Sequence, residues 1–335
     1  MKLGLSQASY RWMCYPHMRY DTPEYRFSER RLPYFTSVDP PADLYDPVPW
    51  LLQRVAAHDL RSLYMVVGWL KDDDGARTFG AERKARELEF LAAASANLAA
   101  TEDEWGDGRY DRSARANNGL TYRLSKVNPG WTGGTQFERV ARSIELAALA
   151  GAKIIVVVHE AATLHNHFTK DPPIGEQIDR IVRNMRTLVP VAEEHGVVMA
   201  HEAHMDYRVS ELIDVLEALG SPWLRHNFDF ANSISVIEDP LDAARRAAQY
   251  TVMTHIKDMR IEPLTTIGEP IFYHTPIGLG DVPVHEILEV LQADAPDPDG
   301  LQNCLEIPTM PEYDAEAWVV ESLRWLRSEC AEFWT

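Results

Sequence analysis

Residues 178–202 read IDRIVRNMRTLVPVAEEHGVVMAHE and join a helical pattern to a strand pattern. Ile, Val, Met and Leu recur three or four residues apart in the first part, which is typical of an amphipathic helix. Gly196 then stands where a helix C-cap glycine is expected, and the apolar run VVMAHE begins directly after it. The stretch therefore predicts one helix–strand unit of an α/β protein.

The same unit recurs along the whole chain. Short apolar runs alternate with amphipathic stretches of about a dozen residues, the pattern of βα units around a parallel sheet. We expect strands at residues 2–8, 62–68, 96–102, 153–159, 197–202, 225–230, 252–257 and 303–307. We expect helices at residues 49–59, 81–95, 135–151, 178–196, 209–220, 240–250, 284–292 and 315–329. Eight such units predict an α/β fold, a (β/α)8 TIM barrel, formed by residues 1–335 as a single domain.

The predicted loops differ in length between the two ends of the barrel. Most connections from helix to strand are a few residues long. Connections from strand to helix are long at residues 9–49, 103–134, 160–175 and 258–282. Such loops lie on the C-terminal face, where TIM-barrel active sites are built. We therefore expect the functional site on that face.

The composition limits the class of protein. Its 335 residues include 33 Lys and Arg against 51 Asp and Glu, a formal charge of −18 that repels nucleic acids and anionic membranes. The N-terminal sequence lacks the apolar core of a signal peptide, and no later stretch reaches the roughly 18 apolar residues of a membrane span. Three scattered cysteines, Cys14, Cys304 and Cys330, argue against a disulfide framework. We expect a cytoplasmic protein with no nucleic-acid and no membrane partner.

Four consecutive predicted strands end in a side chain that can bind a metal: Glu202, Asp229, His255 and Glu306. Alternation along each strand turns one set of side chains into the barrel, so these four can converge near its axis. Their three carboxylates would carry a charge that a divalent cation relieves. Oxygen ligands with one imidazole nitrogen favour Mn²⁺ or Mg²⁺, and Co²⁺, Fe²⁺ and Zn²⁺ also suit such a site. The sequence predicts a divalent-metal site.

Five motifs give the chain a family resemblance: AHEAH (200–204), FDFANS (228–233), HIKDM (255–259), PIGLGDVP (276–283) and LEIP (305–308). In order and spacing they resemble the sugar phosphate isomerase/epimerase family, the xylose-isomerase-like TIM barrels that include tagatose and psicose 3-epimerases. The resemblance implies that the four strand-end residues are the metal ligands and that Glu202 and Glu306 also act as acid and base. The chain departs from the ketose epimerases at Asn232, where they have a histidine.

Two of the long loops are rich in aromatic residues and arginine, at residues 9–35 and 104–134. Such loops can stack on a sugar or a phenolic ring, or bury against another chain. Together with VVVHEAATLHNH (156–167), they resemble the large (alpha) subunit of bacterial C-glycoside deglycosidases. This resemblance implies a carbon–carbon lyase that separates a 3-oxo sugar from an aromatic aglycone, by C2 deprotonation and elimination through a metal-bound enolate. The metal that we expect is Mn²⁺, because oxygen ligands predominate among the four strand-end residues. It also implies a small all-β second (beta) subunit and a hetero-oligomer.

Further candidates lie close to the predicted ligands. His159 ends the fourth predicted strand and is a candidate general base or a donor to the leaving carbon, with Glu160, His165 and His167 as weaker candidates. His204, Asn232 and Lys257 are expected to bind substrate. Lys257 shares the inward face with His255, and the alternative for it is an ion pair with Asp258 or with a ligand carboxylate. His201 is expected to point toward the helices as a structural residue.

Three alternatives stay open. A keto-sugar 3-epimerase or isomerase would use the same metal site and would need no partner chain. A decarboxylase of oxo-sugar acids would need a basic pocket, for which Arg19, Arg123 and Arg260 are the candidates. A carbohydrate-binding scaffold without activity would contain no divalent metal and would be unaffected by a chelator.

Overall fold

The structure is a computed structural model that covers the whole chain. It describes residues 1–10, 37–39, 48–60, 62–66, 119–123, 152–158, 172–263, 268–308 and 313–334, and single positions within 140–148 and 167–170. The predicted helix at residues 81–95 and most of the loop at residues 9–49 lie outside this part of the chain.

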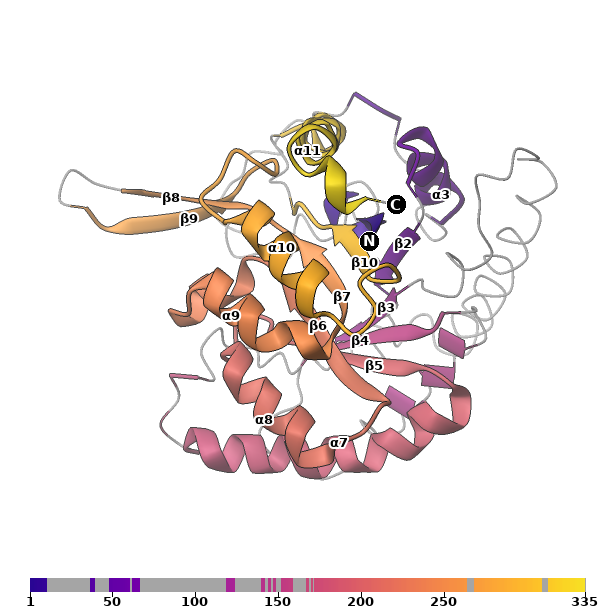
Figure 1. Ribbon diagram of the computed structural model, residues 1–335, viewed down its shortest axis with the longest axis vertical. Helices are drawn as coiled ribbons and strands as arrows, with labels where there is room; N and C mark the ends of the chain where they lie inside the picture. Colours follow the sequence, from indigo (N-terminus) through magenta and orange to yellow (C-terminus); the bar gives the residue numbers. More distant parts are fainter. Residues whose placement is uncertain are drawn as a thin grey trace, which may run out of the picture.

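Eight parallel strands close into a barrel in the order β1-β10-β7-β6-β5-β4-β3-β2 (Figure 1). The strands are β1 (Lys2–Ser6), β2 (Ser62–Val66), β3 (Gly119–Arg123), β4 (Ile154–Val158), β5 (Val198–Glu202), β6 (Leu224–Asp229), β7 (Thr251–Ile256) and β10 (Gln302–Leu305). Closure between the first and last strands is direct, because Leu5 pairs with Leu305 on one side and with Leu63 on the other. The predicted TIM barrel is confirmed.

Helices surround the barrel on its outer side (Figure 1). They are α3 (Val48–Ala57), α7 (Ile174–His195), α8 (Val209–Leu219), α9 (Pro240–Ala247), α10 (Val284–Asp294) and α11 (Ala315–Glu329). Short 3₁₀ segments are η1 (Gln7–Tyr10), η3 (Asn232–Val236), η4 (Ala248–Tyr250) and η5 (Ala331–Phe333). Gly196 and Gly220 end α7 and α8 in the left-handed conformation, as expected of C-cap glycines. The predictions for these helices are therefore confirmed to within a few residues.

The third strand differs from the prediction. Residues 96–102 were expected to form it, but β3 (Gly119–Arg123) occupies the position between β2 and β4, inside the range expected to be a loop at 103–134. The sequence GLTYR contains Thr and Tyr, which favour strands, whereas ANLAATE is rich in alanine, which favours helices. The prediction of residues 96–102 as the third barrel strand is wrong, and these residues lie outside the described part of the chain.

The two faces of the strands bury different groups. Ala200, Met253 and Cys304 pack together inside the barrel, with side chains from β2 and β4. The alternate residues, such as Met199 and Phe228, pack against the helices in the main core. This alternation turns Glu202 inward and His201 outward. It therefore decides which polar side chains can meet on the barrel axis.

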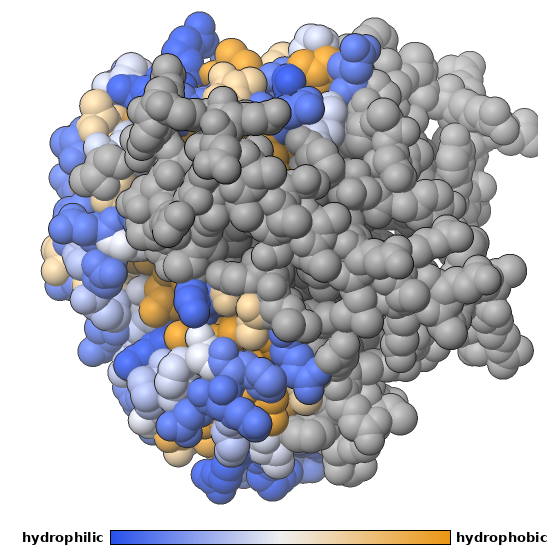
Figure 2. Space-filling model, turned by 90° about the vertical axis from the view of Figure 1, so that its right-hand side faces the viewer, coloured by the Kyte–Doolittle hydropathy of each residue, from blue (hydrophilic) through white to orange (hydrophobic). Residues whose placement is uncertain are grey.

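The surface is mainly hydrophilic on the face shown in Figure 2, where apolar side chains are scattered among polar ones in the described residues. None of the helices in the described ranges is long and apolar enough to cross a membrane.

Candidate metal centre and active site

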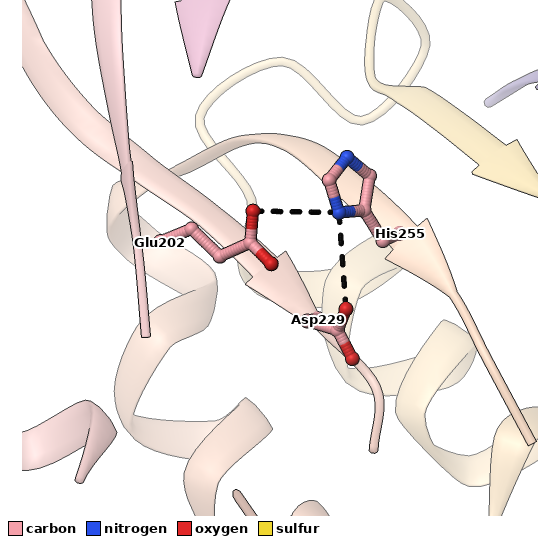
Figure 3. Close-up of side chains that lie close together, drawn as sticks. All are labelled: Glu202, Asp229 and His255. Atoms are coloured by element: carbon pink, nitrogen blue, oxygen red, sulfur yellow. Dashed lines mark ion pairs between the residues drawn. The ribbon is translucent and has the colours of Figure 1, made fainter. Parts of the chain in front are cut away.

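Three of the predicted ligands meet at the C-terminal ends of adjacent strands (Figure 3). Glu202 ends β5, Asp229 ends β6 and His255 lies next to the end of β7. The Nδ1 atom of His255 lies 3.4 Å from Glu202 Oε2 and 3.8 Å from Asp229 Oδ2. One ligand atom from each residue lies within 4.8 Å of the other two, and all three side chains are buried. The alternation predicted from the sequence brings these residues together.

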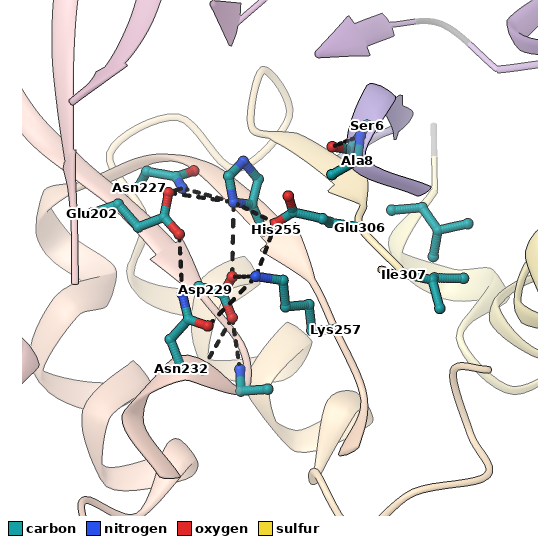
Figure 4. A network of polar contacts seen from close by, with 12 residues as sticks. Ser6, Ala8, Glu202, Asn227, Asp229, Asn232, His255, Lys257, Glu306 and Ile307 are labelled. Atoms are coloured by element: carbon teal, nitrogen blue, oxygen red, sulfur yellow. Dashed lines mark hydrogen bonds and ion pairs between the residues drawn. The ribbon is translucent and has the colours of Figure 1, made fainter. Parts of the chain in front are cut away.

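Glu306 and Lys257 extend this cluster (Figure 4). Glu306 follows β10 directly, and its Oε2 atom lies 3.0 Å from His255 Nδ1 and 3.0 Å from Lys257 Nζ. The Nζ atom of Lys257 also lies 2.6 Å from Asp229 Oδ2. The ammonium group therefore bridges two carboxylates of the candidate site. This is the ion pair with ligand carboxylates that stood as the alternative to substrate binding by Lys257.

Two asparagine side chains hold Glu202. Asn227 donates from Nδ2 to Glu202 Oε2 over 3.1 Å, and Asn232 donates from Nδ2 to Glu202 Oε1 over 3.0 Å. Both asparagines are buried. Each carboxylate oxygen of Glu202 thus accepts one amide hydrogen bond, which fixes the plane of the carboxylate. Asn232 was predicted near the site, whereas Asn227, which faces inward from β6, was not.

The backbone of the turn after β6 fixes Asp229. Its Oδ1 atom accepts hydrogen bonds from the N–H groups of Ala231 and Asn232, at 3.0 and 3.1 Å. An aspartate commonly makes such bonds to the amides that follow it, as in an Asx turn. The other oxygen, Oδ2, is left to face Lys257 and His255.

His255 is oriented mainly by packing. The ring of Tyr64, from β2, lies against it with centroids 4.5 Å apart and planes inclined by 49°. The Nδ1 atom of His255 lies 3.3 Å from Asn227 Nδ2. These contacts aim Nδ1 at the carboxylates. The sequence pattern indicated neither Tyr64 nor Asn227, because each is an ordinary inward residue of a strand.

Opposite charges shift the ionisation of the cluster. Burial by itself lowers the pKa of His255, but the carboxylates of Glu306 and Glu202 outweigh it and hold that pKa well above its usual value. Burial also disfavours the charged form of Glu306, yet His255 and Lys257 keep the pKa of Glu306 well below its usual range. Lys257 and Asp229 hold each other ionised in the same way, with the pKa of Lys257 raised and that of Asp229 lowered. The cluster is a compensated set of charges.

The donor set fits a divalent metal. Bonds of about 2.1 Å place neighbouring ligand atoms roughly 3 to 3.5 Å apart around one ion, and the separations from His255 Nδ1 are close to this. Metal binding requires a neutral imidazole, so it would release the proton that the carboxylates now stabilise on His255. Three carboxylates and one ammonium then leave an excess of two negative charges, which one divalent cation balances. Glu202, Asp229 and His255 are the residues that would hold the ion, with Glu306 beside them.

A glycine loop is anchored next to the cluster by Asp258. The Oδ2 atom of Asp258 accepts from the N–H groups of Gly278 and Gly280 at 2.9 and 2.8 Å, and Oδ1 accepts from Val282 N–H at 3.2 Å. A Cβ atom at Gly280 would lie 2.0 Å from Asp258 Oδ1, so only glycine fits there. These bonds explain why HIKD and PIGLGD occur as paired motifs. Lys257 precedes this anchor, which holds the backbone at the end of β7.

Ser9 supports the opposite side of the cluster. Its Oγ atom donates to Leu305 C=O over 2.9 Å and accepts from Ile307 N–H at 3.0 Å. These two residues flank Glu306, so Ser9 holds the backbone that carries its carboxylate. Figure 4 shows Glu306 and Ile307 close to the start of the chain at Ser6 and Ala8. This contact continues the pairing of β1 with β10 beyond the ends of the two strands.

The remaining predicted site residues have different positions. His159, Glu160 and His165 lie outside the described residues; the last residue of β4, Val158, pairs with Glu202 in the barrel. His204 is half-buried after β5, and its N–H donates to Asp206 Oδ1 over 3.0 Å. His167 contacts Glu211 of α8, with Nδ1 and Oε1 2.6 Å apart. The structure therefore places His167 against a helix and not in the metal-ligand cluster.

A comparison with protein families places the chain. Residues 124–329 match the family described as "Xylose isomerase-like TIM barrel". The chain belongs to this family. All four strand-end residues of this xylose isomerase-like barrel lie in the matched range.

Solved structures share this fold at low sequence identity. The IolI protein with a bound zinc atom is similar with a TM-score of 0.60 at 13% identity, over 100% of each chain. The 3-keto-D-glucoside 4-epimerase YcjR of E. coli is similar with a TM-score of 0.57 at 15% identity, over 98% of this chain and 99% of its own. Among curated proteins, YihM of Escherichia coli (strain K12) is 33% identical over 69 residues. That match spans 21% of this chain and 21% of YihM. The structural similarities show a common fold.

Proposed function

We propose that the chain is a divalent-metal-dependent lyase that acts on a 3-oxo C-glycoside and cleaves the C–C bond to an aromatic aglycone. The observation that carries this proposal is the buried cluster of three carboxylates, one imidazole and one ammonium at the C-terminal ends of adjacent barrel strands. Such a set suits the removal of a proton next to a ketone, because it offers bases and cations within a few ångströms of each other.

Two features support a 3-oxo glycoside as the substrate. One structural neighbour is described as a 3-keto-D-glucoside 4-epimerase, so the same fold handles an oxidised sugar of this kind. In addition, the sequence at residues 9–35, and at residues 104–118 and 124–134 on either side of β3, supplies aromatic side chains that could stack on a phenolic ring. The aglycone and the sugar would then be recognised by different parts of the chain.

The proposed reaction is a proton removal followed by an elimination. A base takes the proton from C2, and the C–H electrons enter the enolate of the C3 ketone. The enolate then reforms the ketone as a C1=C2 double bond appears, the C1–aryl bond breaks, and the aryl carbon takes up a proton. A bound divalent metal would supply Lewis-acid stabilisation of the negative oxygen.

The described residues can take defined parts in this reaction. Glu306 is the more exposed of the two glutamates, 8% against 2% for Glu202, and lies beside the Lys257 ammonium. We assign the base to Glu306 and a contact with the developing oxyanion to Lys257. Glu202 is held on both oxygens and serves as a fixed ligand that borders the reacting carbon. His159 stays the proposed donor to the leaving carbon, and Asn232 and His204 the proposed contacts to sugar hydroxyls.

A keto-sugar epimerase is the second candidate, and one observation favours it. Glu202 and Glu306 both approach His255 Nδ1, at 3.4 and 3.0 Å, so two carboxylates border the same centre. An epimerase needs acid and base groups on two faces of one carbon. The decarboxylase finds less support, since the Arg260 side chain is 47% exposed on the hairpin of residues 259–274. The side chains of its other two candidates, Arg19 and Arg123, lie outside the described part of the chain.

We propose Mn²⁺ as the metal, because carboxylate oxygens predominate in the cluster. We also propose that a small all-β subunit joins the chain in a hetero-oligomer, as the resemblance to deglycosidase alpha subunits implies. The subunit would cover the aromatic segments at residues 9–35, 104–118 and 124–134 and complete the aglycone site.

The test is incubation of the purified chain with a 3-oxo C-glucoside and Mn²⁺, with and without a candidate β subunit. We expect released aglycone, abolished by a chelator and lowered at least roughly 1,000-fold in a Glu306→Gln variant. An Arg245→Gln variant, altered at an exposed ion pair on α9, serves as the control and should stay active. Turnover of a free ketose without release of aglycone would move the assignment to the epimerase. Full activity in metal-free protein would reject both.

A further inference from the structure

We propose that the hairpin formed by β8 (Met259–Pro263) and β9 (Pro270–His274) joins two copies of the chain through the outer edge of β9. This inference is independent of the proposed reaction. The hairpin follows β7 and projects away from the barrel (Figure 1). Its two strands pair with each other and with no other described strand. A two-stranded hairpin of this kind is only marginally stable in water by itself.

The outer edge of β8 is already covered. Ile261 N–H donates to Asp281 Oδ2 over 2.8 Å, and Asp281 N–H donates to the Met259 carbonyl over 2.8 Å. These bonds show that Met259 and Ile261 turn their backbone groups away from β9. An acidic side chain and a backbone amide therefore block further strand pairing on this side.

The outer edge of β9 pairs with no strand in the described part of the chain. Ile261 pairs with Phe272 across the hairpin, and the outward N–H of Ile261 makes this a non-hydrogen-bonded pair. The N–H and C=O of Phe272 must then also point outward, on the other side. Within the described residues, no hydrogen bond satisfies them. This edge could accept another strand.

One face of the hairpin is apolar and exposed. Ile261 and Phe272 lie opposite each other on this face with 44% and 47% of their surface exposed. The exposed Pro263 and Pro270 form the next pair on the same face. A solvated apolar face beside an open strand edge is unfavourable in a protein that acts alone.

The charge of the strand favours a second copy as the occupant. The sequence of β9, PIFYH, contains no Asp, Glu, Lys or Arg, although the whole chain has a formal charge of −18. Two copies repel each other over most of their surfaces, and an uncharged edge is where they can approach at least cost. A positively charged partner protein would have no acidic side chain to pair with on this strand.

The strand is also compatible with twofold symmetry. Antiparallel pairing centred on Phe272 would join the N–H and C=O groups of the two Phe272 residues reciprocally and set Ile271 opposite Tyr273 of the second copy. The two hairpins would become one four-stranded sheet with a continuous apolar face. Three or more strands are what such a sheet needs to be stable.

The expected dimer is weak and reversible. A five-residue strand buries less than the roughly 800 Å² per partner of a standard interface. We therefore expect a dissociation constant on the order of 10 μM or above. Sedimentation velocity of the full chain over a range of concentrations should show a monomer that converts to a dimer as the concentration rises.

A charge at the centre of the strand should prevent this. We expect Phe272→Lys to remain monomeric at every concentration, with an unchanged far-ultraviolet circular dichroism spectrum and thermal midpoint. The matched control is Val320→Lys on α11, where the side chain is 50% exposed and lies on a helix and not on a strand edge; it should dimerise like the wild type. A wild-type chain that stays monomeric, or a Phe272→Lys variant that dimerises normally, would overturn the proposal.

A cross-link tests the geometry itself. In the proposed pairing the Cα atoms of the two Phe272 residues lie about 5.5 Å apart, within the range that a disulfide spans. Phe272→Cys should form a dimer under mild oxidation that a reducing agent dissolves, at a rate at least tenfold above that of Val320→Cys. Equal rates for the two variants would exclude pairing of β9 with itself.

Discussion

Two buried histidines on neighbouring strands have opposite environments. His255 points into the barrel from β7, and His226 lies on β6, where alternate residues such as Phe228 face the helices. They are 1% and 0% exposed. Carboxylates hold the pKa of His255 well above its usual value against the effect of burial. Burial lowers the pKa of His226 to about 4, although a hydrogen bond with the backbone of His201 acts to raise it.

The difference shows that burial alone does not decide the charge of a side chain in this barrel. The inner end of the sheet gathers charges that compensate one another, and the outer layer holds neutral polar groups among apolar ones. The inner set of side chains suits a bound cation, because the charge of its carboxylates is balanced by neighbouring positive groups. The outer set, to which His226 belongs, contributes to packing, and its protonation lowers the free energy of unfolding of the protein.

The largest expected effect comes from removing the ammonium group of the inner set. Lys257→Met leaves Asp229 and Glu306 without their common partner, and breaking a buried ion pair in this way costs about 3–5 kcal/mol. We expect this loss in the free energy of unfolding, measured by urea denaturation of metal-free protein. Mn²⁺ should reduce the loss, since a divalent cation supplies positive charge to the same carboxylates.

An exposed ion pair provides the control for this prediction. Arg245 and Asp242 lie 2.9 Å apart with more than half of each side chain exposed. Arg245→Met should cost no more than about 1 kcal/mol. Equal losses for Lys257→Met and Arg245→Met would mean that the inner cluster is more open to water than its burial indicates.

The outer histidine should make stability depend on pH. The unfolded chain binds a proton on His226 below about pH 6.5, and the folded chain binds it only near pH 4. The contribution of His226 to the free energy of unfolding should therefore be constant above about pH 7.5 and fall by about 2–3 kcal/mol between pH 7 and pH 4.5. His226→Leu should remove this part of the fall, as measured by urea denaturation at the two pH values.

Ile287 on α10 is the control for that measurement, because it is fully buried and has no ionisable group. Ile287→Val should lose some stability at every pH and keep the full pH dependence of the wild type. The comparison therefore isolates the titration of the buried histidine. The same pH dependence in His226→Leu and the wild type would contradict a neutral His226.

The barrel and the grouping of three candidate metal ligands could be predicted from the sequence, for a physical reason. Period-two alternation and C-cap glycines depend on local residues, so β5 and α7 could be located from the stretch at residues 178–202. Equivalent strand ends lie on one face of a barrel, and so Glu202, Asp229 and His255 could be grouped without a structure.

Other features depend on contacts between distant segments and could not be predicted. Asn227 and Tyr64 are ordinary inward residues of their strands until the barrel closes around His255. Ser9 supports Glu306 across almost the whole length of the chain. The third strand was misplaced because alanine-rich residues 96–102 are apolar enough to imitate a buried strand.

The smallest expected effect compares two buried asparagines on either side of the sheet. Asn227 faces inward and donates to Glu202, whereas Asn303 on β10 lies on the outer side and accepts from Thr254 Oγ1 at 2.7 Å. Both are 0% exposed. Asn227→Leu should weaken Mn²⁺ binding roughly 10- to 100-fold, because it frees one oxygen of a ligand carboxylate. Isothermal titration of metal-free protein measures this directly, without a substrate.

Asn303→Leu should lower the thermal midpoint, since it leaves the Thr254 hydroxyl unpaired, and should leave the affinity for Mn²⁺ unchanged. The visible spectrum of the Co²⁺-loaded protein gives a second measure, because a ligand that is less firmly held alters the coordination of the ion. We expect a changed spectrum for Asn227→Leu alone. The contradicting result is an equal loss of stability in both variants with no change in metal affinity in either. Asn227 would then contribute only to the packing of the barrel, as Asn303 does, and would not position a metal ligand.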